Sequence, residues 1–208
     1  MASIMIHLAI AKKVKEYFNI KKEKDYYLGA IAPDISKQIG ESKEKSHFLI
    51  NTTDNIPNIT LFIKRYPTFK YNSFNLGYYT HLMTDKLWIE EFIPNLIQDN
   101  TIKLSNSSIL SSTTTEEIEN MLYSDYTNLN SQIIDEYEMD LSIFYEEFIP
   151  PTTQLQEIPI DQLDILLNKM GIIIQNSKEE KSYTLDFEAI KAFIENTSKE
   201  IIKELKRY

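Results

Sequence analysis

The 208-residue chain contains no cysteine. It can therefore form neither a disulfide framework nor a thiolate metal site, and a transition metal would have to be held by histidine, aspartate or glutamate. Histidine is itself scarce, with three in the whole chain, so few nitrogen ligands are available. The absence of cysteine fits a reducing compartment.

The chain also lacks an excess of basic residues. Lysine and arginine number 22 against 31 aspartates and glutamates, which gives a formal net charge of -9. This charge repels phosphate backbones, and it argues against stable nucleic-acid binding driven by counterion release. A small anionic substrate would need a local cation on the protein.

Long apolar runs are missing as well. None approaches the roughly 18 residues that a membrane span requires, so we expect no transmembrane segment. The first residues, SIMIHLAIA, are apolar, but His7 interrupts them, and Lys12 and Lys13 follow them rather than precede them. These are not the features of a secretory signal, and we expect a cytoplasmic protein. The sequence carries no signature of the oligomeric state.

Helical periodicity dominates what is present. The segment DYYLGAIAPD predicts a short helix that stops at Ala32, because Pro33 disfavours the helical region for the residue before it. There is no internal repeat and no alternation long enough to build a sheet. We therefore predict an all-α fold, a single-domain multi-helix bundle of about seven or eight helices over residues 1–208. Residues 1–92 carry the candidate ligands, and residues 113–208 form a helical half without an assigned role.

Local signals place the helices of this bundle. Apolar positions recur at helical spacing from Ser3 onward, and a polar loop with Gly40 is predicted over residues 36–46. Further helices are predicted after Pro57, from about 75 to 92 before Pro94, after a Thr114 to Glu117 capping box, over residues 161–170 with Gly171 as the C-terminal cap, and from Asp186 to Leu205. The stretch GIIIQ, residues 171–175, is predicted to be extended.

The segment GYYTHLMTDKLW places His81 and Asp85 one helical turn apart. Their side chains could bind one cation, or simply each other. Trp88 and Phe92 continue the same helix face, so this face is predicted to point inward. A buried Asp85 would then need a cation or hydrogen-bond donors to neutralise it. The alternative, a carboxylate that only orients a histidine, stays open here.

Asp34 and His47 come from two further segments. Asp34 follows an apolar stretch and His47 lies in one, so both side chains are predicted to point inward, toward this pair. Alone, Asp34 could be a helix N-cap and His47 a buried pocket imidazole. Together, two histidines and two carboxylates make a nitrogen and oxygen ligand set suited to zinc, or to manganese or iron.

The ordered segments MIHLAIA, YYLGAIAPDI, SHF and GYYTHLMTDKLW resemble the zinc-dependent phospholipase C family, whose fold is shared with single-strand-specific fungal nucleases. The resemblance covers about residues 1–92 and implies a phospholipase C-like bundle. It also implies that His7 matches the family's first histidine and that Asp85 can bridge to a second ion, so one or two zinc ions are expected. The implied ligands of one zinc are Asp34, His47, His81 and Asp85.

The chain departs from the family pattern in two places. Family phospholipases use a mature N-terminal amine as a ligand, and no signal that would create that end is recognised here. The family also carries a later cluster of two histidines and a glutamate, whereas no histidine follows His81. One four-ligand site and a partial second site around His7 and Asp85 remain. Glu90, Glu91 and the Glu116, Glu117 and Glu119 group could replace the cluster, although solvated surface positions are the simpler interpretation.

We therefore expect a metal-dependent phosphoester hydrolase in which a metal-bound hydroxide attacks a phosphodiester. By resemblance, Asp34 is the candidate general base, and the substrate is a small phosphoester or a lipid head group. The alternative is a non-catalytic helical interaction module stabilised by a metal. An HD-type phosphohydrolase, also all-α, needs an adjacent His-Asp pair, which this chain lacks.

Overall fold

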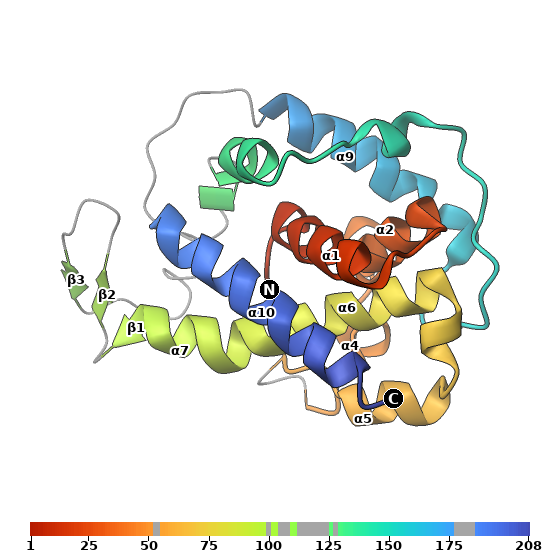
Figure 1. The fold of residues 1–208 in the computed structure, drawn as a ribbon, viewed down its shortest axis with the longest axis horizontal. Coiled ribbons are helices and arrows are strands. Elements are labelled where there is room, and N and C mark those ends of the chain that lie inside the picture. The colour runs from red at the N-terminus through yellow and green to blue at the C-terminus, as the bar shows by residue number, and fades with distance from the viewer. Residues whose placement is uncertain (52–54, 99–100, 104–108, 112–124, 127–128, 177–185) are drawn as a thin grey trace.

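Helices form most of the fold in the computed structural model, which describes residues 1–51, 55–98, 101–103, 109–111, 125–126, 129–176 and 186–208 (Figure 1). The predicted all-α class is confirmed. The longer helices are α1 (Ile4–Phe18), α2 (Glu23–Ile31), α6 (Ser73–Leu87), α9 (Asp164–Asn176) and α10 (Phe187–Leu205). The shorter ones are α3 (Ile35–Gln38), α4 (Lys43–Ser46), α5 (Ile59–Arg65) and α7 (Ile93–Leu96), and residues 129–136 are also helical.

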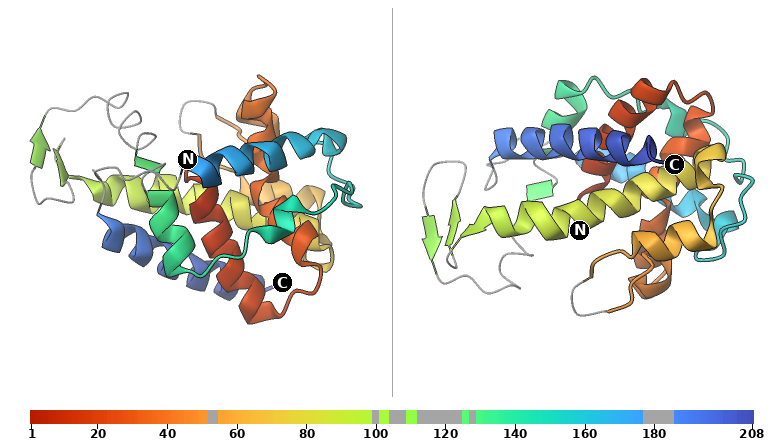
Figure 2. Two further views of the ribbon diagram at one scale, coloured as in Figure 1. Left: turned by 90° about the horizontal axis from the view of Figure 1, so that it is seen from above. Right: turned by 60° about the horizontal axis from the view of Figure 1, so that its bottom comes forward.

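Helix α1 packs against α2, α6 and α10, so the first and last helices of the chain lie side by side (Figures 1 and 2). The Ser3 side chain caps α1 by accepting a hydrogen bond from the backbone N–H of Ile6. Most of the helix from Met5 to Val14 is buried, because neighbours cover it on several sides. This burial carries His7 into the interior, as its apolar spacing predicted.

Helices α2 and α6 approach each other so closely that glycine is needed on both. A Cβ on Gly77 would overlap the carbonyl oxygen of Tyr26, and one on Gly29 would overlap the carbonyl oxygen of Phe74. The two backbones therefore touch directly, with no side chain between them. This contact fixes the second half of α2 against the first turns of α6.

Helix α2 ends next to Pro33 as predicted, although not for the predicted reason. Ala32 keeps helical angles, with φ −57° and ψ −37°. The backbone departs from α-helical angles one residue earlier, at Ile31, with φ −118° and ψ −12°. The chain then enters a 3₁₀ turn at Ala32–Asp34. Asp34 thus lies at the junction between this turn and α3.

The predicted loop over residues 36–46 is only partly a loop, since its two ends belong to α3 and α4. Gly40 makes the turn between them with a φ of 75°, a value that favours glycine. His47 and Phe48 then return to the core, with exposed fractions of 0% and 3%, as predicted.

The helical run that begins as α6 continues past its predicted end. A π-helical turn at Trp88–Phe92 leads into α7, so the chain stays helical to Leu96. Proline has no N–H to donate and crowds the preceding turn, which usually breaks an α-helix. The wider π turn directly before Pro94 accommodates it. The predicted inward position of Trp88 and Phe92 is confirmed.

The predictions near Gly171 are wrong, because α9 runs through this residue to Asn176 and GIIIQ is helical rather than extended. A glycine inside a helix costs only about 1 kcal/mol relative to alanine. The burial of Leu166 and Met170 on the same helix outweighs that cost. Asp186 caps α10 as predicted, accepting from the backbone N–H of Glu188 at 3.0 Å.

Three very short strands follow α7, namely β1 (Ile97–Gln98), β2 (Thr101–Lys103) and β3 (Ile109–Ser111). They pair antiparallel in the order β1-β2-β3, with Ile102 opposite Ile97 and Leu110. The sequence predicted no sheet, since strands of two or three residues are too short for alternation to reveal. The predicted Thr114 to Glu117 capping box lies outside the described residues.

Buried apolar side chains from Ala2 to Leu205 form one cluster that joins the helices. The division of the chain into residues 1–92 and 113–208 stays a prediction. In the part of the chain that the structure describes, no helix has the length and apolar character needed to cross a membrane.

We expect Gly77→Ala to lower the free energy of unfolding by roughly 1 to 3 kcal/mol, because the new methyl group overlaps backbone atoms of α2. Gly171→Ala is the matched control, since a Cβ there meets nothing within 4 Å. It should raise the free energy of unfolding by about 0.5 to 1 kcal/mol. Urea denaturation followed by circular dichroism measures both. A Gly77→Ala protein as stable as the wild type would contradict the direct backbone contact.

Candidate metal centre

The five side chains predicted as a site meet at one place in the fold, although they come from four separate segments. In each histidine and in Asp85 the side chain is fully buried, whereas the Asp34 side chain keeps an exposed fraction of 12%. Their sources are α1 for His7, the 3₁₀ turn for Asp34, the end of α4 for His47, and α6 for His81 and Asp85.

One oxygen of Asp85 and one nitrogen of each of two histidines converge at the centre. The Nε2 atoms of His47 and His81 lie 3.2 Å apart. Asp85 Oδ2 lies 3.5 Å from His47 Nε2 and 3.3 Å from His81 Nε2. These three residues form a group that could hold a metal ion.

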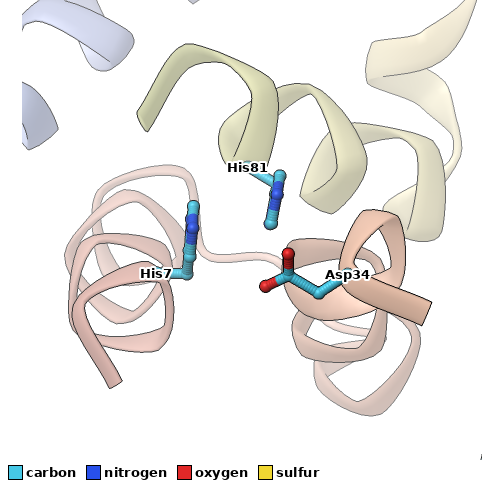
Figure 3. Close-up of side chains that lie close together, drawn as sticks. All are labelled: His7, Asp34 and His81. Atoms are coloured by element: carbon cyan, nitrogen blue, oxygen red, sulfur yellow. The ribbon is translucent and has the colours of Figure 1, made fainter. Parts of the chain in front are cut away.

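His7, Asp34 and His81 form a second such group, which shares His81 with the first (Figure 3). The rings of His7 and His81 are stacked, with centroids 3.9 Å apart and planes 6° from parallel. Asp34 is also linked to the first group, since its Oδ1 lies 3.8 Å from His47 Nε2. The predicted four ligands and His7 are therefore brought together.

The ring of His81 is oriented by the backbone of α2. Its Nδ1 lies 2.8 Å from the carbonyl oxygen of Ala30, which can only accept, so Nδ1 carries a hydrogen. In the neutral ring, Nε2 then presents its lone pair to the centre. A backbone carbonyl that holds the outer nitrogen in this way is the usual support of a metal-ligating histidine.

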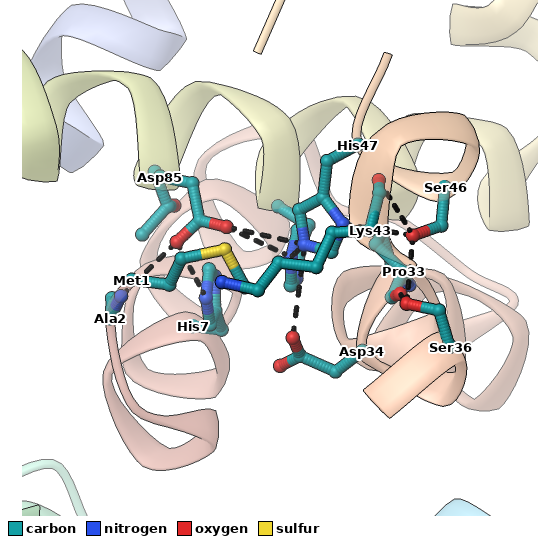
Figure 4. Close-up of polar contacts among 12 residues, drawn as sticks. Met1, Ala2, His7, Pro33, Asp34, Ser36, Lys43, Ser46, His47 and Asp85 are labelled. Atoms are coloured by element: carbon teal, nitrogen blue, oxygen red, sulfur yellow. Dashed lines mark hydrogen bonds and ion pairs between the residues drawn. The ribbon is translucent and has the colours of Figure 1, made fainter. Parts of the chain in front are cut away.

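His47 is oriented in a similar way by a serine pair (Figure 4). Its Nδ1 lies 2.9 Å from the Ser46 hydroxyl, which itself donates to the carbonyl oxygen of Lys43. Ser36 supports Ser46 at 3.0 Å and donates to the carbonyl oxygen of Pro33. The contact between Ser46 and His47 Nδ1 holds the ring from outside, so that Nε2 faces the centre.

Several buried polar atoms at the centre have no hydrogen-bond partner among the described residues. They are both ring nitrogens of His7 and the Oδ2 atom of Asp85. His7 Nε2 does lie 3.3 Å from Asp85 Oδ1, without hydrogen-bond geometry. Buried polar groups are nearly always paired, so this cluster of unpaired carboxylate and imidazole atoms fits a site for a cation.

The electrostatics of the group are set by burial and by Asp85. Burial and the neighbouring His81 lower the pKa of His47 to about 4, and the same two causes lower the pKa of His7. Burial alone would lower the pKa of His81, but the nearby charge of Asp85 raises it. Burial alone would raise the pKa of Asp85, but His7 and His81 hold it well below its usual value. The Asp85 side chain at the centre is therefore a carboxylate.

The start of the chain also reaches this centre. The backbone N–H of Ala2 donates to Asp85 Oδ1 at 3.1 Å, and the Tyr126 hydroxyl donates to the carbonyl oxygen of Met1. The predicted partial second site around His7 and Asp85 thus has a backbone amide beside it. This amide donates a hydrogen and offers no lone pair to an ion.

The structure decides between some of the alternative interpretations. Asp34 occupies the N-cap position of α3, as one alternative predicted, but its side chain makes no capping hydrogen bond. Glu90 and Glu91 are exposed, and Glu90 pairs with Lys86, which confirms the surface interpretation. Glu116, Glu117 and Glu119 lie outside the described residues.

Sequence reasoning missed the groups that orient the rings. The Ala30 carbonyl has no signature in a sequence, since every residue carries one. Ser46 does have a weak one, because it directly precedes His47 in the segment KSHF.

A pocket of about 540 Å³ opens over the centre, and of the five site residues Asp34 lines it. The other four lie deeper. The pocket walls come from the start of the chain, α3, α4 and α9, with residues including Met1, Ala2, Lys37, Lys43 and Lys169.

Comparison with known proteins identifies one family for this chain. The family model described as zinc dependent phospholipase C matches residues 4–208, well beyond the resemblance noted over residues 1–92. No curated protein and no solved structure gives a match.

We expect the metal-free protein to lose stability as the pH falls from about 6.5 to about 4. Unfolded His47 takes up a proton near its ordinary pKa of 6.5, whereas folded His47 takes it up only at about 4. The unfolded state then binds more protons, so the free energy of unfolding falls with pH, by an amount on the order of 1 to 3 kcal/mol.

The measurement is urea denaturation in the presence of a chelator across this pH range, and His47→Gln should flatten the slope. His81 acts in the opposite sense, because its raised pKa gives stability that is lost as the pH rises through its folded value. His7, whose pKa is also lowered, acts in the same sense as His47. The stability that Asp85 contributes is present above its unfolded pKa of 3.8 and is lost mainly below the lower end of this window. An equal slope in the wild type and in His47→Gln would contradict the assignment.

Proposed function

The chain belongs to the zinc-dependent phospholipase C family, and we propose that it is a metal-dependent hydrolase of small phosphoesters or lipid head groups. The observation that carries the proposal is the convergence of His47 Nε2, His81 Nε2 and Asp85 Oδ2 within 3.5 Å of one another in a fully buried place. Both rings are held from outside so that Nε2 faces inward. Such an arrangement is typical of a metal site with a complete outer support.

The described residues alone do not satisfy this centre, because both ring nitrogens of His7 and the Oδ2 atom of Asp85 keep no hydrogen-bond partner among them. A cation held by His47, His81 and Asp85 would use the carboxylate and the inward-facing nitrogens. The lone pair of the neutral His7 ring remains available to a second ion. Nitrogen and carboxylate donors without thiolate suit zinc, and manganese or iron would also be accepted.

When bound, the ion supplies a lowered pKa for a coordinated water and stabilises negative charge on a phosphoryl oxygen. The residues of the chain supply position and proton transfer. Asp34 is the one site residue that is both partly exposed and at the pocket wall. Its carboxylate can therefore accept the proton of the attacking water at Oδ1 or Oδ2, on the side where a phosphodiester enters.

Burial of the other four site residues has its own role. His7, His47, His81 and Asp85 are shielded from solvent by the surrounding helices. The low local dielectric strengthens each charge interaction there. Burial also keeps the rings in one orientation, which catalysis by positioned groups requires.

The alternative, a non-catalytic module stabilised by a metal, rests on the absence of any histidine after His81. Fewer ions can be held than in the full family cluster. The two functions separate on turnover, because a structural ion raises the melting temperature without any hydrolysis.

We expect the zinc-loaded protein to hydrolyse a chromogenic phosphodiester such as bis(p-nitrophenyl) phosphate, with activity lost on chelation and restored by zinc. Asp34→Asn should lower kcat by about 10²- to 10⁴-fold while zinc is retained, because the amide cannot accept the proton. His81→Ala should lose stoichiometric zinc, measured by mass spectrometry. Glu90→Gln, an exposed carboxylate on the same helical run, should change neither quantity.

Three results would contradict parts of this proposal. Zinc that raises the melting temperature of a protein without turnover favours the interaction module. Full zinc content in His81→Ala would show that His81 is not a ligand and would contradict the proposed site. Loss of zinc in Asp34→Asn would show that Asp34 is a ligand rather than a base.

A further inference from the structure

Lys43 lies over the candidate metal centre on the same helical turn as one of its histidines. It starts α4, and the backbone N–H of His47 donates to its carbonyl oxygen at 2.8 Å. Residues four apart on a helix lie on one face, so the Lys43 and His47 side chains are neighbours. Figure 4 shows the extended Lys43 side chain crossing in front of His47, with its amino group on the side of Met1 and His7.

The Lys43 side chain is half-buried and lines the 540 Å³ pocket together with Asp34. Its charge also acts on the centre, since it contributes to the lowered pKa of His47 after burial and His81. Lys43 thus lines the pocket and also acts on the buried centre.

The pocket is richer in lysine than the composition of the chain would suggest. Lys37 from α3 and Lys169 from α9 line it with Lys43, so three helices direct a lysine to one place. The carboxylates on its wall are Asp34, Glu41 and Glu44. The pocket is thus neutral in sum, whereas the chain carries a net charge of -9.

A phosphoester anion that enters this pocket meets Asp34 first and Asp85 behind it. Two carboxylates repel it, and the chain lacks the later histidines that hold further cations in the resembled family. A compact ammonium on a flexible stem is well suited to bind a phosphoryl oxygen as a point charge.

We propose that Lys43 binds the phosphoryl group of the substrate and supplies positive charge that this chain does not obtain from a third metal ion. The ligand chemistry is an anionic phosphoryl group, whether on a soluble phosphoester or on a lipid. The inference rests on the proposed function for its role in turnover, but the binding of phosphate to Lys43 can be measured without any reaction.

The test is isothermal titration calorimetry of zinc-loaded protein with inorganic phosphate, for the wild type, Lys43→Met, Lys43→Arg and Lys45→Met. Lys43→Met keeps most of the side-chain length and removes the charge. It should weaken phosphate binding about tenfold or more, as the loss of one charge-assisted hydrogen bond implies. Lys43→Arg should keep most of the affinity. Lys45→Met is the matched control, because Lys45 lies on the same short helix, is exposed and does not line the pocket.

Zinc content and melting temperature are measured for each variant, and both should stay at the wild-type values in Lys43→Met. With bis(p-nitrophenyl) phosphate, Lys43→Met should raise KM by a similar factor. Phosphate binding equal to that of the wild type in Lys43→Met, or no phosphate binding by the wild type, would overturn the inference.

The outcomes separate this inference from the proposed function. If phosphate binding depends on Lys43 but no protein turns over the phosphodiester, the phosphoryl site stands and the hydrolase does not. If the wild type hydrolyses and Lys43→Met keeps both KM and phosphate affinity, only the role of Lys43 fails. A second arm uses phosphatidylcholine vesicles: binding that Lys43→Met weakens indicates a lipid head group, and phosphate binding alone a soluble phosphoester, and both support the site.

Discussion

The buried carboxylate of Asp85 is the constraint on which the rest of the structure depends. A charge in an apolar interior is costly unless a partner neutralises it. Four separate contributions surround it, namely the backbone N–H of Ala2 and the rings of His7, His47 and His81. They come from the start of the chain, from α1, from the end of α4 and from α6. The carboxylate therefore connects these segments as well as the candidate ligands.

The fold brings these groups together by close backbone contact and by fixed rings. Gly29 and Gly77 each lie directly against the backbone of the facing helix, which sets α2 against α6. The Ala30 carbonyl of α2 in turn orients His81 of α6. Disturbing this packing would therefore move a ligand, even though neither glycine touches the centre. A change that destabilises the packing of α2 on α6 is therefore expected to change the geometry of the site as well.

The site could be predicted further from the sequence than the fold could. The one-turn spacing of His81 and Asp85, and the scarcity of histidine, directed attention to residues that the structure brings together. The ends of helices were less predictable, because a π turn accommodates Pro94 and packing outweighs the cost of Gly171. Orienting groups such as Ser46 and the Ala30 carbonyl depend on tertiary contacts, which no local pattern in the sequence reveals.

We propose, above all, that the buried cluster of histidine nitrogens and carboxylate oxygens binds a cation. The most direct measurement is anomalous scattering at the zinc absorption edge from a crystal of the zinc-loaded protein, because it locates ions and their ligands together. We predict a strong peak within coordination distance, about 2.0 to 2.2 Å, of His47 Nε2, His81 Nε2 and an Asp85 oxygen. Zinc found only at surface carboxylates, with the His and Asp cluster empty, would contradict the central claim.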